Sequence, residues 1–104
     1  MLITTTQDIP GREIAEILDI ARGSTVRSRN IGRDFGAAMR SIVGGEVKAY
    51  TTLMAKAREE ALDRMIADGR ALGADAIVNV RLQTSSVMTG ASEIVAYGTA
   101  VKLK

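Results

Sequence analysis

The sequence predicts an α+β fold in which one long helix accompanies strands that pair antiparallel. The first observation is an amphipathic segment with helical spacing, Glu46–Leu72. The second is a pair of strand-like segments, Ala74–Thr84 and Ser92–Lys104, joined by a short connection that contains Thr89 and Gly90. Two strands joined in this way pair as an antiparallel hairpin. Helices and antiparallel strands in separate parts of a chain are typical of the α+β class.

The first strand is expected at Leu2–Thr6, which is rich in β-branched residues and is followed by a turn at Pro10 and Gly11. The next segment fits two patterns. The apolar residues of Arg12–Ala21 recur at helical spacing, and they also alternate between the two sides of a strand. Periodicity alone favours a helix for Arg12–Ala21 and a strand for Ser24–Ser28, and both remain open for the first of these segments.

A short helix is expected at Arg33–Val43. Phe35, Met39 and Ile42 recur at spacings of four and three residues, which places them on one helix face. The Gly-Gly pair that follows ends this helix, because glycine readily takes the left-handed conformation found at helix ends.

The long helix is expected to begin at Glu46 and to end at Leu72, because Gly73 follows and stops it. About 27 residues at about 1.5 Å each make a rod of about 40 Å. Charged residues fall largely on the side opposite to an apolar stripe. The stripe consists of Tyr50, Met54, Ala57, Ala61 and Met65, and it is widened by Leu53, Leu62 and Ile66.

The two C-terminal strands are expected to present distinct faces. In Ala74–Thr84, Val78, Val80 and Leu82 face one way. The last strand is fairly apolar on both faces, and its small residues suit close contact with another layer. One of its faces carries Val95, Tyr97, Val101 and Leu103, and the other carries Ile94, Ala96, Gly98 and Ala100.

The length of the long helix suggests that the chain does not stand alone. A chain of 104 residues is expected to form one domain, covering residues 1–104. A compact domain of this size has a radius of gyration of about 13 Å, so a helix of about 40 Å does not fit within its outline. A second copy of the chain would cover the helix and the apolar last strand, and we expect a homo-oligomer. The alternative is a monomer whose helices cover both faces of the sheet.

The composition excludes several kinds of site. The chain has no Cys and no His, which excludes disulfides, thiol nucleophiles and zinc sites built on sulfur or imidazole. A net charge of +2 gives little attraction to nucleic acid or to a membrane surface, so neither is expected as a partner. We expect no cofactor. No secretory signal and no apolar stretch of membrane-spanning length is recognised, which favours a cytoplasmic location.

A set of short motifs covers nearly the whole chain. They are Arg33-Asp34, Ile42–Gly45 with Glu46 and Tyr50 after it, Ala57-Arg58, Ala71–Ala76 and Gly98–Val101. In these motifs the chain closely resembles the YbjQ-like family of small uncharacterised bacterial proteins, which carries a heavy-metal-binding label.

The resemblance implies a dodecin-like α+β subunit, with a curved antiparallel sheet, one short helix and one long helix. It implies that residues 12–28 form a long strand, and we adopt that interpretation over the helical periodicity because pairing in a sheet can override local pattern. It also implies a ring-shaped homo-oligomer, a pentamer.

The metal label conflicts with the composition of this chain. Soft heavy metals bind thiolate or imidazole, and neither is present. The carboxylates of Glu59, Glu60 and Asp63 could hold a hard cation such as Mg²⁺ or Ca²⁺, but a solvated helix face explains them as well. No metal ligand is therefore assigned.

The candidate ligand-binding residues are the polar positions that coincide with the family motifs. They could line a pocket at a subunit junction and hold a small anionic ligand, or they could make structural ion pairs and backbone contacts. These residues are Arg33, Asp34, Tyr50, Arg58 and Glu59. A second candidate is the Gly44-Gly45 pair before the long helix, for which a plain helix corner is favoured because Glu46 would repel a phosphate.

The sequence does not define a function. We expect a non-catalytic homo-oligomeric module for binding or scaffolding, because no spacing of Asp, Glu, Lys or Tyr selects a catalytic group. Two alternatives stay open: a metal-ion-binding protein that uses carboxylates, and a small-molecule carrier or enzyme with its site at subunit junctions.

Overall fold

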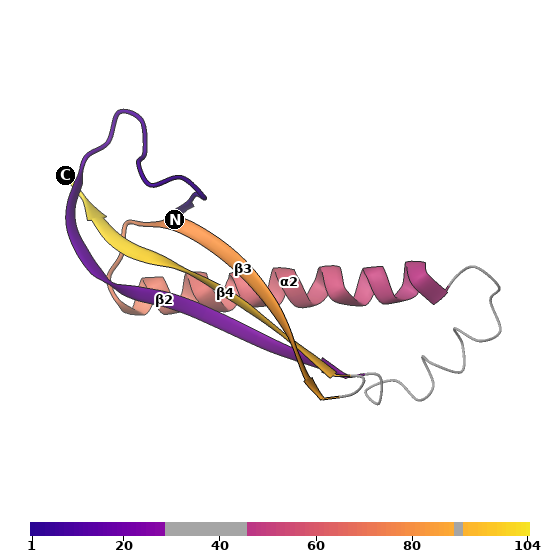
Figure 1. The fold of residues 1–104 in the computed structure, drawn as a ribbon. Coiled ribbons are helices and arrows are strands. Elements are labelled where there is room, and N and C mark those ends of the chain that lie inside the picture. Colours follow the sequence, from indigo (N-terminus) through magenta and orange to yellow (C-terminus); the bar gives the residue numbers. More distant parts are fainter. Residues whose placement is uncertain (29–45, 89–90) are drawn as a thin grey trace.

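The computed structural model describes residues 1–28, 46–88 and 91–104. In this part of the chain a single helix lies along one face of a curved sheet, which makes two layers (Figure 1). The α+β class is therefore confirmed. The elements are β1 (Leu2–Ile3), β2 (Ile14–Ser28), α2 (Glu46–Ala71), β3 (Ala76–Met88) and β4 (Ala91–Leu103). The predicted short helix at residues 33–43 lies outside the described residues.

The sheet has the strand order β1-β3-β4-β2. β4 pairs antiparallel with both β3 and β2, which confirms the predicted hairpin. β1 pairs parallel with β3, so the sheet is mixed, and the expectation of a purely antiparallel sheet is wrong at this strand. The N-terminal segment continues along β3 beyond β1, because the Thr4 amide donates to the Ile77 carbonyl and the Val80 amide donates to the Thr4 carbonyl, both at 3.0 Å.

β2 is one continuous strand, paired with β4 from Ile14 to Ser28. The helix that periodicity favoured for residues 12–21 is therefore wrong, and the strand implied by the resemblance is confirmed. Register shifts between Ile14 and Glu16 and between Ile17 and Asp19 explain the misleading pattern. Each bulge inserts an extra residue, so apolar positions fall three apart in places and imitate helical spacing.

α2 confirms the predicted long helix and ends one residue earlier than expected, at Ala71. Its C-terminus is closed by backbone hydrogen bonds from Gly73 to the Arg70 carbonyl and from Ala74 to the Gly69 carbonyl, both 3.0 Å. Gly73 has a φ of +83°, a conformation that glycine takes without the strain a side chain would cause.

The main core lies between α2 and the sheet, and it consists largely of small residues. Ala57, Ala61 and Met65 of the predicted stripe are fully buried there. They pack on Ala21 of β2 and on the small residues of β4. The expectation that the small residues of β4 contact another layer is confirmed, and that layer is the chain's own helix, which covers Ala96 and Ala100.

A bulge in β3 alters the predicted faces of that strand. Two residues, Asn79 and Val80, lie opposite a single residue of β4, and Asn79 has a φ of 55°. Val78 consequently joins a second small cluster with Ala76 and Val101, whereas Val80 belongs to the main core. The prediction that Val78 and Val80 share one face is wrong because one inserted residue reverses the alternation of side chains.

Thr25 is the one buried polar side chain of the described core, at 2% exposure. Its hydroxyl donates to the Ala57 carbonyl of α2 at 3.1 Å. We expect Thr25→Val, which keeps the shape, to lower the free energy of unfolding by about 1 kcal/mol, the usual net value of one hydrogen bond. Urea unfolding followed by circular dichroism measures the change, and a variant as stable as the parent would show that the bond contributes nothing.

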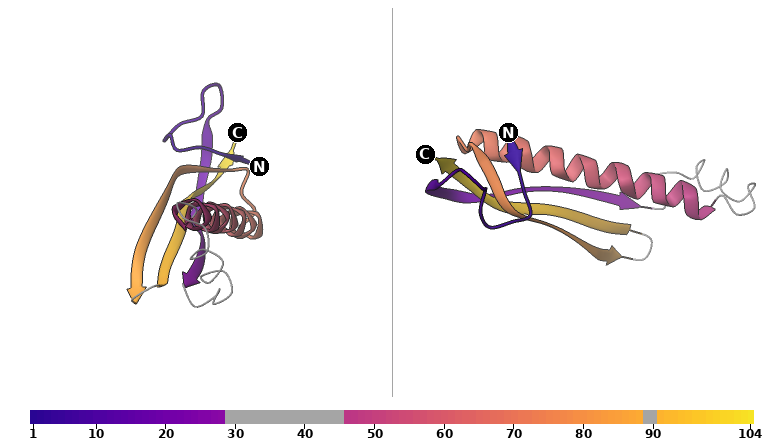
Figure 2. Two further views of the ribbon diagram at one scale, coloured as in Figure 1. Left: turned by 90° about the vertical axis from the view of Figure 1, so that its right-hand side faces the viewer. Right: turned by 90° about the horizontal axis from the view of Figure 1, so that it is seen from above.

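The chain is elongated, with extents of 55 × 23 × 18 Å and a radius of gyration of 17.1 Å. A compact domain of this length would have a radius of gyration of about 13 Å. The two termini lie at the same end of the sheet, as Figure 1 shows. The views in Figure 2 show α2 on one side of the strands only. The chain therefore accommodates its long helix because the whole fold is elongated along that helix.

Candidate functional site on the open sheet face

The sheet face opposite α2 carries polar side chains from each of the three long strands. Directly opposed residues of antiparallel strands share a face. Cross-strand register therefore gives three rows on this side: Arg22–Tyr97–Arg81, Ser24–Val95–Gln83 and Val26–Glu93–Ser85. We call this side the open face. It comprises Ile17, Ile20, Arg22, Ser24 and Val26 of β2, Arg81, Gln83 and Ser85 of β3, and Glu93, Val95, Tyr97 and Thr99 of β4.

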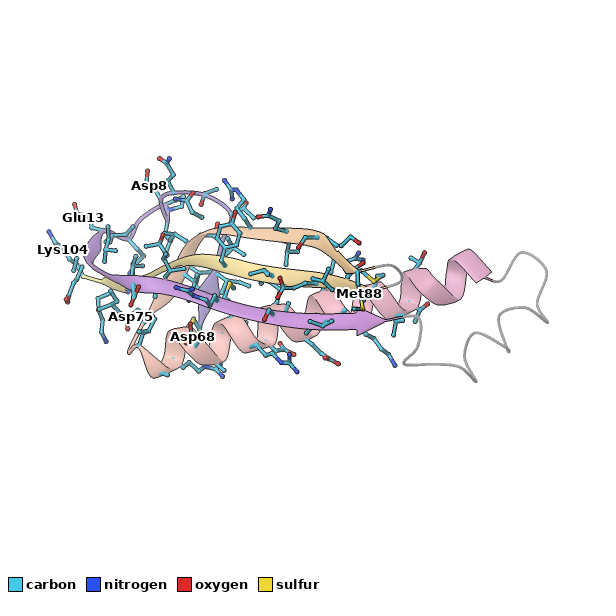
Figure 3. All side chains as sticks on the ribbon, turned by 60° about the horizontal axis from the view of Figure 1, so that its bottom comes forward. Asp8, Glu13, Asp68, Asp75, Met88 and Lys104 are labelled. Atoms are coloured by element: carbon cyan, nitrogen blue, oxygen red, sulfur yellow. The ribbon has the colours of Figure 1, made fainter. Side chains whose placement is uncertain are left out.

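Large apolar side chains are exposed at both lateral edges of the sheet. On β2 they lie on the open face, where Ile17 is 69% exposed and Ile20 is 52% exposed. On β3 they lie in the second half of the strand, where Met88 is 66% exposed and lies at the opposite end of the sheet from Glu13 and Lys104 (Figure 3). The β2 set consists of Ile17, Ile20 and Val26, and the β3 set of Leu82, Val87 and Met88.

Two side chains of α2 bind the outer backbone edge of β2. The Arg22 amide donates to Oδ2 of Asp68 at 2.9 Å, and the Arg64 guanidinium donates to the Ser24 carbonyl. Asp68 lies beside β2 in Figure 3. An edge strand otherwise presents unpaired amide and carbonyl groups to other chains, so these contacts protect the middle of β2 from unspecific pairing.

An open depression of about 520 Å³ lies at this place. Among the described residues, the guanidinium of Arg22 and the carboxylate of Glu93 make no hydrogen bond or ion pair. The site therefore presents an unpaired cation and an unpaired anion on one surface, beside the apolar side chain of Val95. Its lining consists of Arg22, Gly23 and Ser24 of β2, Arg64 of α2, and Glu93 and Val95 of β4.

Arg81 lies on the open face but is occupied. Its Nη1 donates to the Thr5 carbonyl at 2.9 Å and to the Val80 carbonyl at 2.8 Å. This residue therefore holds the N-terminal segment against the bulge of β3, and it does not take part in the depression.

The predicted ligand-binding residues do not line this depression. Arg33, Asp34 and the side chain of Tyr50 lie outside the described part of the chain. Arg58 and Glu59 are exposed on α2, next to Ala57, which faces the sheet. Their role as ligand-binding residues stays a prediction.

The carboxylates considered for a hard cation do not form a centre with other ligands. Within residues 1–28, 46–88 and 91–104, no three acidic side chains gather closely enough to hold a metal ion. In the same residues, no helix has both the length and the apolar character needed to cross a membrane.

Most residues of the depression could not be recognised as a site in the sequence, because they come from three elements far apart in the chain. In the sequence, Arg22 is only a charged residue that follows the ambiguous segment at residues 12–21, and Arg64 is only part of the charged face of the long helix. One local signal was available: Gly23 interrupts a strand-like segment, and a glycine inside a strand often marks the close approach of another backbone.

Comparison with known proteins identifies the family. A family model named YbjQ_1 and described as "Putative heavy-metal-binding" matches residues 1–104. The chain belongs to the YbjQ family. Its relatives include UPF0145 proteins of Halobacterium salinarum, 56% identical over 103 residues (99% of each chain), and of Photobacterium profundum, 57% identical over 103 residues (99% of this chain and 100% of that one). Another, from Thermosipho africanus, is 55% identical over 104 residues, covering 100% of this chain and 96% of the relative.

A solved structure supports the YbjQ fold. The crystal structure of a DUF74-family protein of unknown function from Pediococcus pentosaceus superposes with a TM-score of 0.69, covering 100% of this chain and 98% of the other. The two sequences are 17% identical, so the likeness concerns the fold alone. The family description speaks of heavy metals, whereas this YbjQ chain has neither Cys nor His.

Proposed function

We propose that this YbjQ-family chain is a non-catalytic homo-oligomeric binding or scaffold module, assembled as the ring of five copies that the family resemblance implies. The observation that carries the proposal is the exposure of large apolar side chains on both edge regions of an elongated subunit. Single exposed apolar residues are normal on protein surfaces, but neighbouring ones, such as Ile17 and Ile20 of β2 or Val87 and Met88 of β3, make apolar patches of the kind that mark interaction sites.

The position of the two apolar sets favours a ring over a two-fold dimer. The β2 set lies at one side of the sheet and the β3 set at the other, because the strand order is β1-β3-β4-β2. A contact that joins two different surfaces of identical chains is head-to-tail, and it closes into a ring when the rotation per copy allows. A half-exposed Ile or Met that becomes covered in such a contact contributes about 1 kcal/mol.

The absence of catalysis is proposed on chemical grounds. The chain contains no His and no Cys, the residues that most often serve as proton-transfer groups and thiol nucleophiles. The polar groups of the open face can bind charged or hydrogen-bonding ligands without transforming them.

Ile20→Lys tests the assembly. A lysine in the centre of the β2 set would have to be buried without a partner in the contact, so we expect the variant to dissociate into single chains. Native mass spectrometry of parent and variant reports the subunit number directly. The control is Ala67→Lys, which adds the same charge at an exposed position of α2 and should keep the parent's subunit number. An Ile20→Lys variant that assembles like the parent would exclude the β2 set from the contact.

A further inference from the structure

We propose that the depression over β2 and β4 binds a small zwitterion whose two charges are separated by several bonds, of the ω-amino acid type. All the lining residues belong to one copy of the chain, and Arg22 and Ser24 lie between Ile20 and Val26 of the β2 set, so the copy that covers this set in the proposed assembly must leave the depression open. Neither the family description nor the relatives assign a ligand of this class.

The anionic end of the ligand fits between Arg22 and Arg64. The Arg22 guanidinium has no partner among the described residues. Arg64 reaches the outer edge of β2, where Nη1 donates to the Ser24 carbonyl. A guanidinium carries five N–H donors, so Arg64 retains donors for a ligand after making this bond. Two guanidinium groups beside one strand suit a carboxylate, which accepts paired hydrogen bonds from their planar forks.

The cationic end fits Glu93. This carboxylate lines the same depression, is partly buried, and makes no hydrogen bond or ion pair with a described residue. An ionised carboxylate only accepts hydrogen bonds, so an ammonium group is its natural partner. An anionic ligand without an ammonium group would meet repulsion from Glu93, which is why a zwitterion is favoured over a simple anion.

The strand register sets the spacing of the two ends. Arg22 lies opposite Tyr97, Ser24 opposite Val95, and the next row contains Glu93. Rows on one face repeat at about 7 Å, so the Ser24 row, where Arg64 binds, lies about 7 Å along the strands from the Glu93 row, and the Arg22 row about 13 Å from it. Val95 lies between the two charged ends and offers an apolar surface to the carbon chain of the ligand.

The experiment titrates the full chain with 6-aminohexanoate and observes amide chemical shifts by NMR. Hexanoate and hexylamine, which each lack one charged end, are the matched ligands, and glycine has its charges too close together. Because each end makes charge-assisted hydrogen bonds, we expect 6-aminohexanoate to bind at least about tenfold more tightly than the other three. Equal affinity for 6-aminohexanoate and hexanoate, or no binding at about 10 mM, would overturn the proposal.

Two substitutions assign the ends. Glu93→Gln should lower the affinity for 6-aminohexanoate about tenfold without lowering the affinity for hexanoate. Arg22→Gln should lower the affinity for 6-aminohexanoate about tenfold without lowering the affinity for hexylamine. Lys56→Gln, at an exposed position of α2, is the control and should leave the affinities for all three ligands unchanged. Parent-like 6-aminohexanoate affinity in both Glu93→Gln and Arg22→Gln would contradict the site. Titration of the parent with hexanoate and hexylamine tests the site even where a variant fails to fold.

Native mass spectrometry of the same samples separates this proposal from the proposed assembly. A parent protein that assembles as proposed but does not bind 6-aminohexanoate overturns the ligand site alone. Single chains that still discriminate 6-aminohexanoate from hexanoate overturn the assembly alone.

Discussion

Gly23→Ala is expected to lower the free energy of unfolding by at least about 3 kcal/mol, which is a large part of the stability of a small domain. Gly23 is buried where β2 passes under α2. A Cβ atom at this position would overlap the backbone nitrogen of Met65 and the backbone oxygen of Ala61. Backbone atoms of a helix cannot rotate aside as a side chain can, so the whole helix would have to move away from the sheet.

The measurement for Gly23→Ala is the denaturant midpoint of unfolding, followed by circular dichroism. Ser24→Ala, at the next position of the same strand, is the matched control, because its side chain is exposed and its Cβ is already accommodated. We expect the control to stay within about 0.5 kcal/mol of the parent. If Gly23→Ala proves as stable as Ser24→Ala, β2 and α2 do not approach each other closely at this position.

Met65→Ala is expected to cost 2–5 kcal/mol, roughly the range for a fully buried methionine truncated to alanine. Met65 is completely inaccessible to solvent and is the largest of the buried side chains of α2. The buried core that contains Met65 includes five alanines, besides Ile77, Val80 and Ile94. The short alanine side chains cannot fill the space left by the methionine, so at least part of the cavity would remain and add to the cost.

Met65→Leu is the control for the volume of the side chain. It keeps the size and apolar character of the residue, so we expect a loss below about 1.5 kcal/mol. Thermal unfolding of parent, Met65→Leu and Met65→Ala, recorded at one protein concentration, gives the comparison. Equal midpoints for the alanine and leucine variants would show that α2 does not pack on the sheet through Met65.

The local pattern of the sequence predicted those elements whose residues repeat regularly. The stripe through Ala57, Ala61 and Met65 identified α2, and Gly73 marked its end to within one residue. The two faces of the last strand were also assigned correctly, because β4 keeps its alternation from Ala91 to Leu103 and its helix-side residues Ile94, Ala96 and Ala100 are buried.

The spacing of apolar residues gave wrong predictions where a bulge interrupts the alternation of side chains along a strand. The register shifts near Glu16 and Asp19 made a strand look helical, and the bulge at Asn79 moved Val78 to the face opposite Val80. A bulge depends on how two strands pair, and one strand's sequence does not contain that information. The resemblance to the YbjQ-like family, which covers the whole chain, supplied the correct strand for residues 14–28.

The depression could not be predicted, because its geometry depends on contacts between distant segments. The Arg64 side chain meets the carbonyl of Ser24 forty residues earlier, and Asp68 meets the amide of Arg22 forty-six residues earlier. Neither contact follows from residue type or spacing. The sequence did indicate that the helix is too long for a compact chain of this size, and the chain is elongated, with a radius of gyration of 17.1 Å.

The central claim is that other copies of the chain cover the apolar sets on β2 and β3. Sedimentation velocity of the parent protein across a hundredfold dilution, with circular dichroism recorded on each sample, tests it most directly. We predict a single species of five subunits at the highest concentration. Any dissociation on dilution should be accompanied by a loss of folded signal. A fully folded protein that sediments as a single chain at every concentration would contradict the claim.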